Sequence, residues 1–302
     1  MLLRTIVYDH SMDEFMEEIL EIKKLFSIKG IEIAIEEMLS NNQHIVKLIS
    51  CGECIKEKES INNTLNLYLS MELYKLLSVQ YINNKLDNII RDQYFFLKNN
   101  EVSYITKKVD EALNSDKVII EKRGIEFINK KNDILSYIIE SIKDIEEINL
   151  NGVLTFKKNI IEKSFIQITK DVVENYMAEK EYKEFIKLLK YFVNLQESVM
   201  EEVNIIVKDN REYIILDKKG EDILNKLIGE LKVEGINGFV NTEDLIISGL
   251  ITNVPKRIII HGYDEKINNE FINTIKDVFL ERVGFCSGCE FCINNKLKRK
   301  GQ

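Results

Sequence analysis

The chain of 302 residues contains a single proline, Pro255. Because proline removes a backbone N–H and clashes with the preceding helical turn, its scarcity permits long uninterrupted helices. It also excludes Pro-rich linkers and collagen-like or polyproline segments. With 45% hydrophobic and 30% charged residues, the chain has the composition of a globular rather than a disordered protein. Its length allows one large domain or two to three modest ones.

The first stretch, residues 1–58, has a mixed pattern. Residues 2–8 form an apolar run typical of a strand, and apolar residues then recur at helical spacing from Phe15 to Phe26 until Gly30 ends the helix. Two more strands are predicted around residues 31–35 and 45–49. The second of these strands leads the chain to its first pair of cysteines.

The second stretch, residues 59–200, is predicted to be mostly helical. Apolar residues recur every three or four positions, as in Leu65, Leu69, Leu73, Leu76 and Leu77, and in Ile134, Leu135, Ile138, Ile139 and Ile142. The clearest helix runs from Val172 to Leu195. Its predicted buried stripe consists of Val173, Tyr176, Met177, Phe185, Leu188, Leu189 and Phe192. The heptads are not sustained long enough for a coiled coil.

The third stretch, residues 201–302, returns to mixed structure. Residues 203–207 and 212–216 are predicted to form a hairpin, followed by helical spacing over residues 221–231. An apolar segment capped by Asn241 or Thr242 is interpreted as a helix, although its isoleucines and Gly249 also fit a strand. Pro255 ends this segment, residues 257–261 resemble a buried strand, and residues 269–283 resemble another helix.

These stretches together predict an α+β fold. The mixed segments 1–58 and 201–302, the latter with a cysteine-rich end, flank the large helical region 59–200. One hypothesis joins the two mixed ends in a single shared sheet, with the helical region as an insertion.

The charge balance bears on partners and compartment. With 42 Lys and Arg against 50 Asp and Glu, the net charge is −8, which argues against a protein that coats nucleic acid. The basic tail, residues 296–300, is interpreted as solvated rather than as a site for phosphate or anionic lipid. No apolar run approaches the about 20 residues needed to span a bilayer, and the N-terminus has no signal-peptide pattern. We therefore expect a cytosolic protein whose thiols are reduced.

All five cysteines lie in two short clusters. Cys51 and Cys54 form one Cys-x-x-Cys pair, and Cys286, Cys289 and Cys292 form a Cys-x-x-Cys-x-x-Cys run. A Cys-x-x-Cys turn lets two thiolates face one ion, and an odd number of cysteines does not fit a closed disulfide framework. If the two ends meet, any four of the five thiolates could form a tetrahedral structural zinc site.

Two other interpretations of the cysteines remain open. The C-terminal run matches the first three ligands of a bacterial ferredoxin loop, but its fourth cysteine and following proline are missing, so Cys51 or Cys54 would have to complete an iron–sulfur cluster. Alternatively the thiols are unliganded, or they form a redox pair. A thioredoxin-like pair is disfavoured because Cys51 and Cys54 do not begin a helix in a βαβ unit. Zinc is favoured over the iron–sulfur cluster.

Other motifs identify no reaction. The histidines are His10, His44 and His261, and they form no metalloprotease motif. His261 ends a buried-looking strand beside Gly262, a position that fits a ligand or a general base but is more often occupied by a packing residue. The glycines form neither a phosphate-binding loop nor a dinucleotide or hydrolase fingerprint.

Two blocks of the sequence resemble the YtxC-like sporulation-associated family. The first covers residues 172–217, with most of the likeness in EKEYKEFIKLLKYFV at 179–193 and a predicted hairpin after it; the second is EDLIISGLITNVPKRIIIH at 243–261. The resemblance implies a link to endospore formation in spore-forming Gram-positive bacteria. It implies no reaction, substrate or catalytic residue, so no functional residues are carried over from the family.

Together with this resemblance, the sequence predicts a sporulation-associated cytosolic protein that acts by interaction with a protein partner rather than by catalysis. Its cysteine-ligated site is expected to hold zinc. The alternative is an iron–sulfur or thiol redox protein that uses the same cysteines. Neither the identity of the partner nor an oligomeric state follows from the residues.

Overall fold

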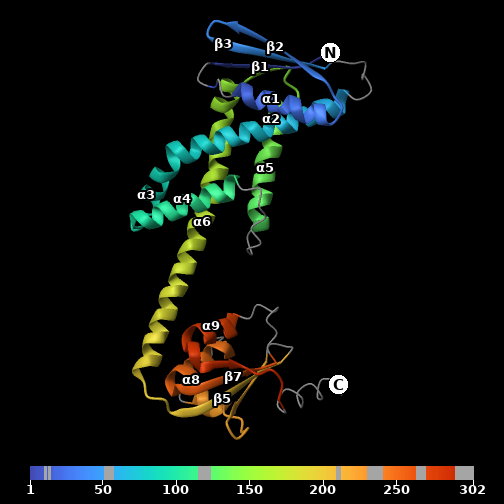
Figure 1. Cartoon of the computed structure of the whole chain (residues 1–302). Helices are drawn as coiled ribbons and strands as arrows, with labels where there is room; N and C mark the ends of the chain where they lie inside the picture. The colour runs from blue at the N-terminus through green and yellow to red at the C-terminus, as the bar shows by residue number, and fades with distance from the viewer. Residues whose placement is uncertain are drawn as a thin grey trace. The chain divides into compact units, whose positions relative to one another are not determined.

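The computed structural model describes residues 1–9, 12, 15–50, 58–114, 124–208, 212–229, 241–262 and 270–289 (Figure 1). The chain divides into two compact units, Met1–Met177 and Ala178–Gln302. This boundary falls inside the stretch that the sequence predicts to be helical. Helix α6 (Leu150–Leu195) has 46 residues and contributes to both units. Such a length is possible because the helix contains no proline.

The first unit contains a four-stranded sheet in the order β2-β3-β1-β4. Strands β1 (Leu2–Asp9), β2 (Ile33–Ser40) and β3 (Gln43–Ser50) are antiparallel neighbours, whereas the short β4 (Glu147–Asn149) pairs with β1 in parallel. The β2–β3 hairpin turns at Asn41 and Asn42, whose positive φ angles of 49° and 67° fit a two-residue turn that matches the strand twist. The three strands expected near residues 2–8, 31–35 and 45–49 are confirmed.

Helix α1 (Phe15–Ile28) follows the sequence pattern closely. Its buried residues are Phe15, Ile19, Ile22 and Phe26, which recur at helical spacing. The helix ends where predicted, because Gly30 adopts φ 76° and its N–H donates to the Ser27 carbonyl while the Ile31 N–H donates to the Phe26 carbonyl. These two bonds form a Schellman motif, which needs a residue with positive φ.

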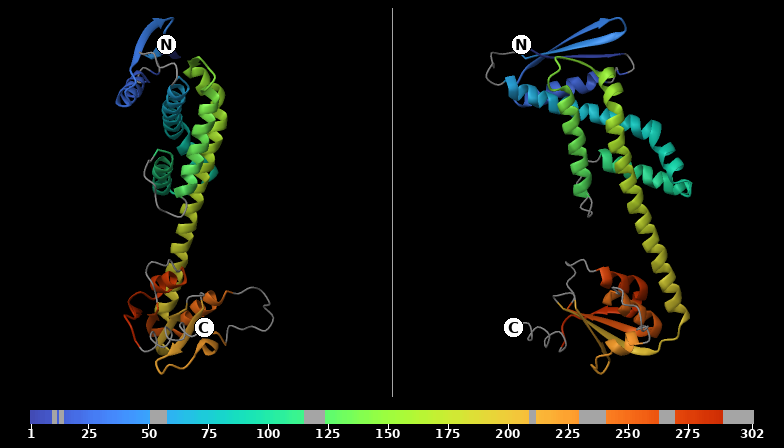
Figure 2. Two further views of the ribbon diagram at one scale, coloured as in Figure 1. Left: turned by 90° about the vertical axis from the view of Figure 1, so that its right-hand side faces the viewer. Right: turned by 180° about the vertical axis from the view of Figure 1, so that it is seen from behind.

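The other described elements of the first unit are helical. They are α2 (Lys58–Tyr81), the π-helical turn η3 (Ile82–Leu86), α3 (Asp87–Gln93), α4 (Asn99–Asn114), α5 (Gly124–Ile142) and the first part of α6. The predicted apolar stripe on α2 is buried at Leu65, Leu69 and Leu73, in one core with α1 and the sheet. Helices α1 and α2 lie against the sheet (Figure 2). The structure confirms that the middle of the chain is mostly helical.

The second unit has its own four-stranded sheet, in the order β6-β5-β7-β8. Strands β5 (Met200–Val207) and β6 (Tyr213–Asp217) form the predicted antiparallel hairpin. Strand β7 (Pro255–His261) runs parallel to β5, and β8 (Val283–Phe285) runs parallel to β7. The helical elements between strands are α7 (Leu224–Ile228), α8 (Thr242–Asn253), α9 (Glu270–Phe279) and the 3₁₀ turn η5 (Leu280–Arg282).

The ambiguous segment before Pro255 is a helix, α8. Its N-cap is Asn241, whose Oδ1 accepts a hydrogen bond from the Glu243 N–H at 3.2 Å. Gly249 faces α7 so closely that a Cβ atom there would lie 2.6 Å from the Leu227 carbonyl oxygen. This close approach explains why a glycine occurs inside the helix.

Two expectations are corrected. The hypothesis of one shared sheet is wrong, because β1–β4 and β5–β8 form separate sheets in different units. The predicted stripe on the last part of α6 is also partly wrong. Phe185, Leu188 and Phe192 are 43–52% exposed, and the buried residues there are Ile186 and Val193. This part of α6 is apolar around more than one face, and the core of the second unit covers only one of them.

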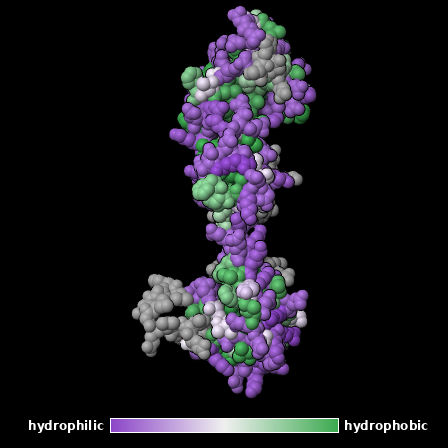
Figure 3. Space-filling model, turned by 90° about the vertical axis from the view of Figure 1, so that its left-hand side faces the viewer, coloured by the Kyte–Doolittle hydropathy of each residue, from purple (hydrophilic) through white to green (hydrophobic). Residues whose placement is uncertain are grey.

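The surface is mostly hydrophilic on the face shown in Figure 3, with hydrophobic residues gathered in patches. None of the described helices is long and apolar enough to cross a membrane.

Candidate metal centre

A group of potential metal ligands lies at the carboxyl ends of the parallel strands in the second unit. His261 is the last residue of β7, and Cys286 directly follows β8. The register pairs Ile260 with Phe285, and the Cys286 N–H extends this ladder by donating to the Ile260 carbonyl at 2.9 Å. Parallel strands place their carboxyl ends at the same edge, which is where open α/β sheets commonly bind ligands. The topology therefore brings together two residues that are 25 positions apart.

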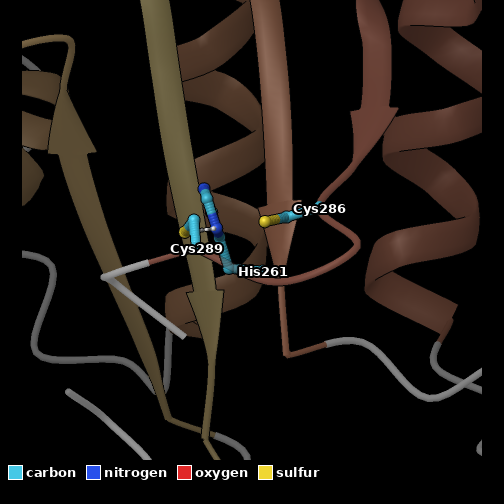
Figure 4. A group of neighbouring side chains, drawn as sticks. All are labelled: His261, Cys286 and Cys289. Carbon is cyan, nitrogen blue, oxygen red and sulfur yellow. Dashed lines mark hydrogen bonds between the residues drawn. The ribbon is translucent and has the colours of Figure 1, made fainter. Parts of the chain in front are cut away.

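The loop after β8 adds a second thiol to this group. The chain bends at Ser287 and Gly288, and Gly288 adopts φ 138°, a conformation that residues with side chains rarely adopt. As a result Cys289 Sγ lies 3.3 Å from His261 Nδ1 (Figure 4). The Gly288 N–H points to Cys286 Sγ at 3.4 Å. His261 Nδ1 or Nε2 and the two sulfur atoms all lie within 4.8 Å of one another.

The orientation of His261 is set by Asn204 on the neighbouring strand. Ile206 is the register partner of His261, so Asn204, two residues earlier on β5, points to the same side of the sheet. Asn204 Oδ1 lies 3.0 Å from His261 Nε2, and both residues are only 3% exposed. The amide nitrogen of Asn204 donates to the Asp217 carbonyl at 3.2 Å and to Glu202 Oε1 at 3.3 Å.

This network determines the tautomer of the histidine. Because the Asn204 amide nitrogen already faces two acceptors, its oxygen must face His261, and Nε2 must then carry the proton. The lone pair of the neutral imidazole is therefore on Nδ1, the nitrogen that faces Cys289. An outer residue that fixes the ligating nitrogen in this way is a usual part of metal sites with histidine.

The electrostatics also favour a neutral imidazole. Burial lowers the pKa of His261 below its ordinary value, and the negative charge of Glu202 opposes this shift only in part. Metal ligation requires the neutral form, because the lone pair is absent from imidazolium.

The backbone leaves the site through Gly262, which adopts φ 70°. A Cβ atom at this position would lie 3.1 Å from the Val207 carbonyl oxygen.

The ligand set fits a small tetrahedral ion. Ligands about 2.0–2.3 Å from zinc are separated from one another by about 3.5–3.8 Å. The observed separations of up to 4.8 Å are slightly wider. Both thiols are half-buried on a loop, so side-chain rotation can bring the sulfurs closer. Three protein ligands leave one position of a tetrahedral ion for a fourth ligand.

The predicted cysteines have different outcomes. Cys286 and Cys289 lie together, as the Cys-x-x-Cys spacing suggests. Cys51, Cys54 and Cys292 lie outside the described residues, and their ligation stays a prediction. The sequence presents His261 as a possible ligand or general base, but the predicted ligand set contains only cysteines. Its only signal in the sequence is its position at the end of a predicted buried strand, and its closeness to the cysteines depends on the pairing of β7 with β8. Asn204 carries no recognisable signal in the sequence.

Fold and site together define an α+β protein with a His-Cys-Cys group at the carboxyl ends of two parallel strands. The family model for the YtxC-like family matches residues 67–284, which is more than half of the chain. The chain therefore belongs to the YtxC-like family. The match includes Asn204 and His261 and ends just before Cys286. No curated protein and no solved structure matches the chain.

Proposed function

We propose that the second unit is a zinc-binding module of a sporulation-associated protein that acts through protein contacts rather than catalysis. The observation that carries the metal part is the convergence of His261, Cys286 and Cys289 within 4.8 Å. A set of one imidazole and two thiolates suits zinc, whereas iron–sulfur clusters are usually held by cysteines alone. Zinc would link the ends of β7 and β8 and so contribute directly to folding.

Cys292 is our proposed fourth ligand. It follows Cys289 by three residues, the same spacing that separates Cys286 from Cys289. A closed site with one nitrogen and three sulfur ligands is a common form of structural zinc. Cys51 and Cys54 are the alternative donors, and separate substitution of Cys292 and of the Cys51–Cys54 pair distinguishes the two cases.

Metal analysis of oxygen-free purified protein tests the proposal. We expect about one zinc per chain and no visible absorbance, since a tetrahedral zinc site is colourless. The variants His261→Ala and Cys286→Ser should lose the bound zinc. Cys292→Ser should bind zinc more weakly than the native protein. His44→Ala and the double variant Cys51→Ser/Cys54→Ser serve as matched controls that should retain the zinc. A folded, metal-free protein would contradict the proposal. Iron together with sulfide and a visible absorbance band would show that the site holds an iron–sulfur cluster instead of zinc.

The proposed role in sporulation comes from what the resemblance implies for the YtxC-like family, to which the chain belongs. Its test is genetic. Deletion of the gene in its own spore-forming host should reduce the number of heat-resistant spores, and the wild-type gene should restore it. Restoration by Cys286→Ser to the full wild-type level would separate the metal site from the biological role.

A further inference from the structure

The two sides of the candidate metal centre differ in how accessible they are. His261 is 3% exposed and held by Asn204, whereas Cys286 and Cys289 are half-buried and the two residues between them are exposed. The thiol side of the centre is therefore more accessible to a reagent from solution than the imidazole side.

The loop also allows the two sulfurs to meet. Cys286 is fixed by the hydrogen bond from its N–H to Ile260, while Cys289 follows the bend at Ser287 and Gly288. The sulfurs lie within 4.8 Å, and a disulfide needs a separation of about 2.05 Å. Rotation of the Cys289 side chain away from His261 supplies movement of this size, because a χ1 change displaces a sulfur atom by about 3 Å.

We propose that this centre is a redox switch in which a peroxide oxidises Cys286 and Cys289 to a disulfide and releases the metal. The inference rests on the proposed zinc site. One thiolate attacks a peroxide oxygen, which forms a sulfenic acid and releases hydroxide. The second thiolate attacks the sulfenic sulfur and displaces a second hydroxide, which forms the S–S bond. Two electrons pass from the two sulfurs to the O–O bond of hydrogen peroxide, and the zinc ion loses two ligands.

The buried half of the site survives this reaction. Asn204 continues to hold His261 Nε2, so the histidine remains oriented toward the vacated position. Reduction of the disulfide therefore regenerates a complete ligand set, and the switch is reversible. In the oxidised form the ends of β7 and β8 are no longer joined through the ion, which lowers the thermal stability of the second unit.

Zinc-loaded full-length protein, treated without oxygen with one equivalent of hydrogen peroxide, tests the switch. A chromophoric chelator that reports free zinc, a thiol count and peptide mass spectrometry are read together. We expect release of the bound zinc, loss of two thiols and a disulfide between Cys286 and Cys289. Dithiothreitol and zinc should restore the starting state.

The matched control is the double variant Cys51→Ser/Cys54→Ser, which removes two thiols that take no part in the proposed step. It should release zinc and form the same disulfide between Cys286 and Cys289. Zinc that stays bound after oxidation, a disulfide that includes Cys292, or sulfinic acid in place of a disulfide would each overturn the switch while leaving the zinc site intact. Failure of untreated protein to bind zinc would instead overturn the proposed function, and the switch with it.

Discussion

Replacement of Asn204 by leucine should weaken metal binding without directly removing a ligand. Leucine has a similar size but cannot accept the hydrogen bond from His261 Nε2, which is 3.0 Å long and fully buried in the native protein. The proton is then free to move to Nδ1, where it finds the sulfur of Cys289 as a neighbour. Metal binding must reverse this change of tautomer and leave the Nε2–H without a partner.

The magnitude follows from the hydrogen bond that is lost. A buried donor without an acceptor costs about 1–3 kcal/mol. Loss of an outer partner of a ligating histidine lowers metal affinity by about 10–100-fold, which corresponds to about 1.4–2.7 kcal/mol. The two ranges agree. We therefore expect Asn204→Leu to bind zinc about 10–100-fold more weakly than the native protein.

Competition with a chromophoric chelator measures this affinity, and thermal unfolding in excess chelator measures the stability of the metal-free protein. Asn204 also bonds to the Asp217 carbonyl, so some loss of metal-free stability is expected as well. Asn204→Asp keeps an acceptor for Nε2 and should retain more of the zinc affinity than the leucine variant. A leucine variant with native zinc affinity would refute the role of Asn204 in orienting His261.

Three further predictions concern stability. Gly249→Ala should lower the free energy of unfolding by about 2–3 kcal/mol in chemical denaturation, because its Cβ would lie 2.6 Å from the Leu227 carbonyl oxygen. Arg4→Met should lower the free energy of unfolding by about 3 kcal/mol. The buried guanidinium of Arg4 donates hydrogen bonds to Asn66 Oδ1 and to the Lys143 and Ile145 carbonyls, and the variant leaves these acceptors without a donor. Burial and the neighbouring Glu18 raise the pKa of Glu72 to about 7, so its folded form holds a proton that the unfolded chain releases between about pH 4.5 and pH 7. The free energy of unfolding of the native protein should therefore fall as the pH rises through this window. Glu72→Gln should raise the free energy of unfolding by about 1 kcal/mol at about pH 8. This value is discounted for solvent screening, because the Glu72 side chain is 22% exposed.

Each of these predictions has a contrary outcome. Native-like unfolding of Gly249→Ala would mean that α7 and α8 can separate at no cost. An unchanged Arg4→Met variant would show that water satisfies the carbonyls. If Glu72→Gln were equally stabilising at about pH 4 and pH 8, its effect would not come from ionisation.

Local patterns predicted the elements whose signals lie within a few residues. Helix α1 has both its apolar spacing and its Gly30 terminator in the sequence, and the β5–β6 hairpin has two apolar runs around a polar turn. Strands β4 and β8 were missed because each has three residues, too few for an alternation pattern. The hypothesis of one sheet shared by the two mixed ends was also wrong, because the pairing of distant strands is decided by tertiary packing and leaves no local signal.

The site was predicted in part for the same reason. Cys286 and Cys289 are linked by their spacing, which is visible in the sequence. His261 joins them only because β7 and β8 are parallel neighbours with α9 between them. Asn204 joins through the register of β5 with β7. These are contacts of the folded sheet, and residue types alone do not report them.

X-ray absorption at the zinc edge, on the full chain loaded with one equivalent of zinc, tests the central claim most directly. Zinc–sulfur bonds of about 2.3 Å and zinc–nitrogen bonds of about 2.0–2.1 Å are resolved by this method. We expect a mixed shell that contains one imidazole nitrogen together with sulfur, and loss of the imidazole signal in His261→Ala. A shell of sulfur alone, or one of oxygen and nitrogen without sulfur, would contradict the His-Cys-Cys centre.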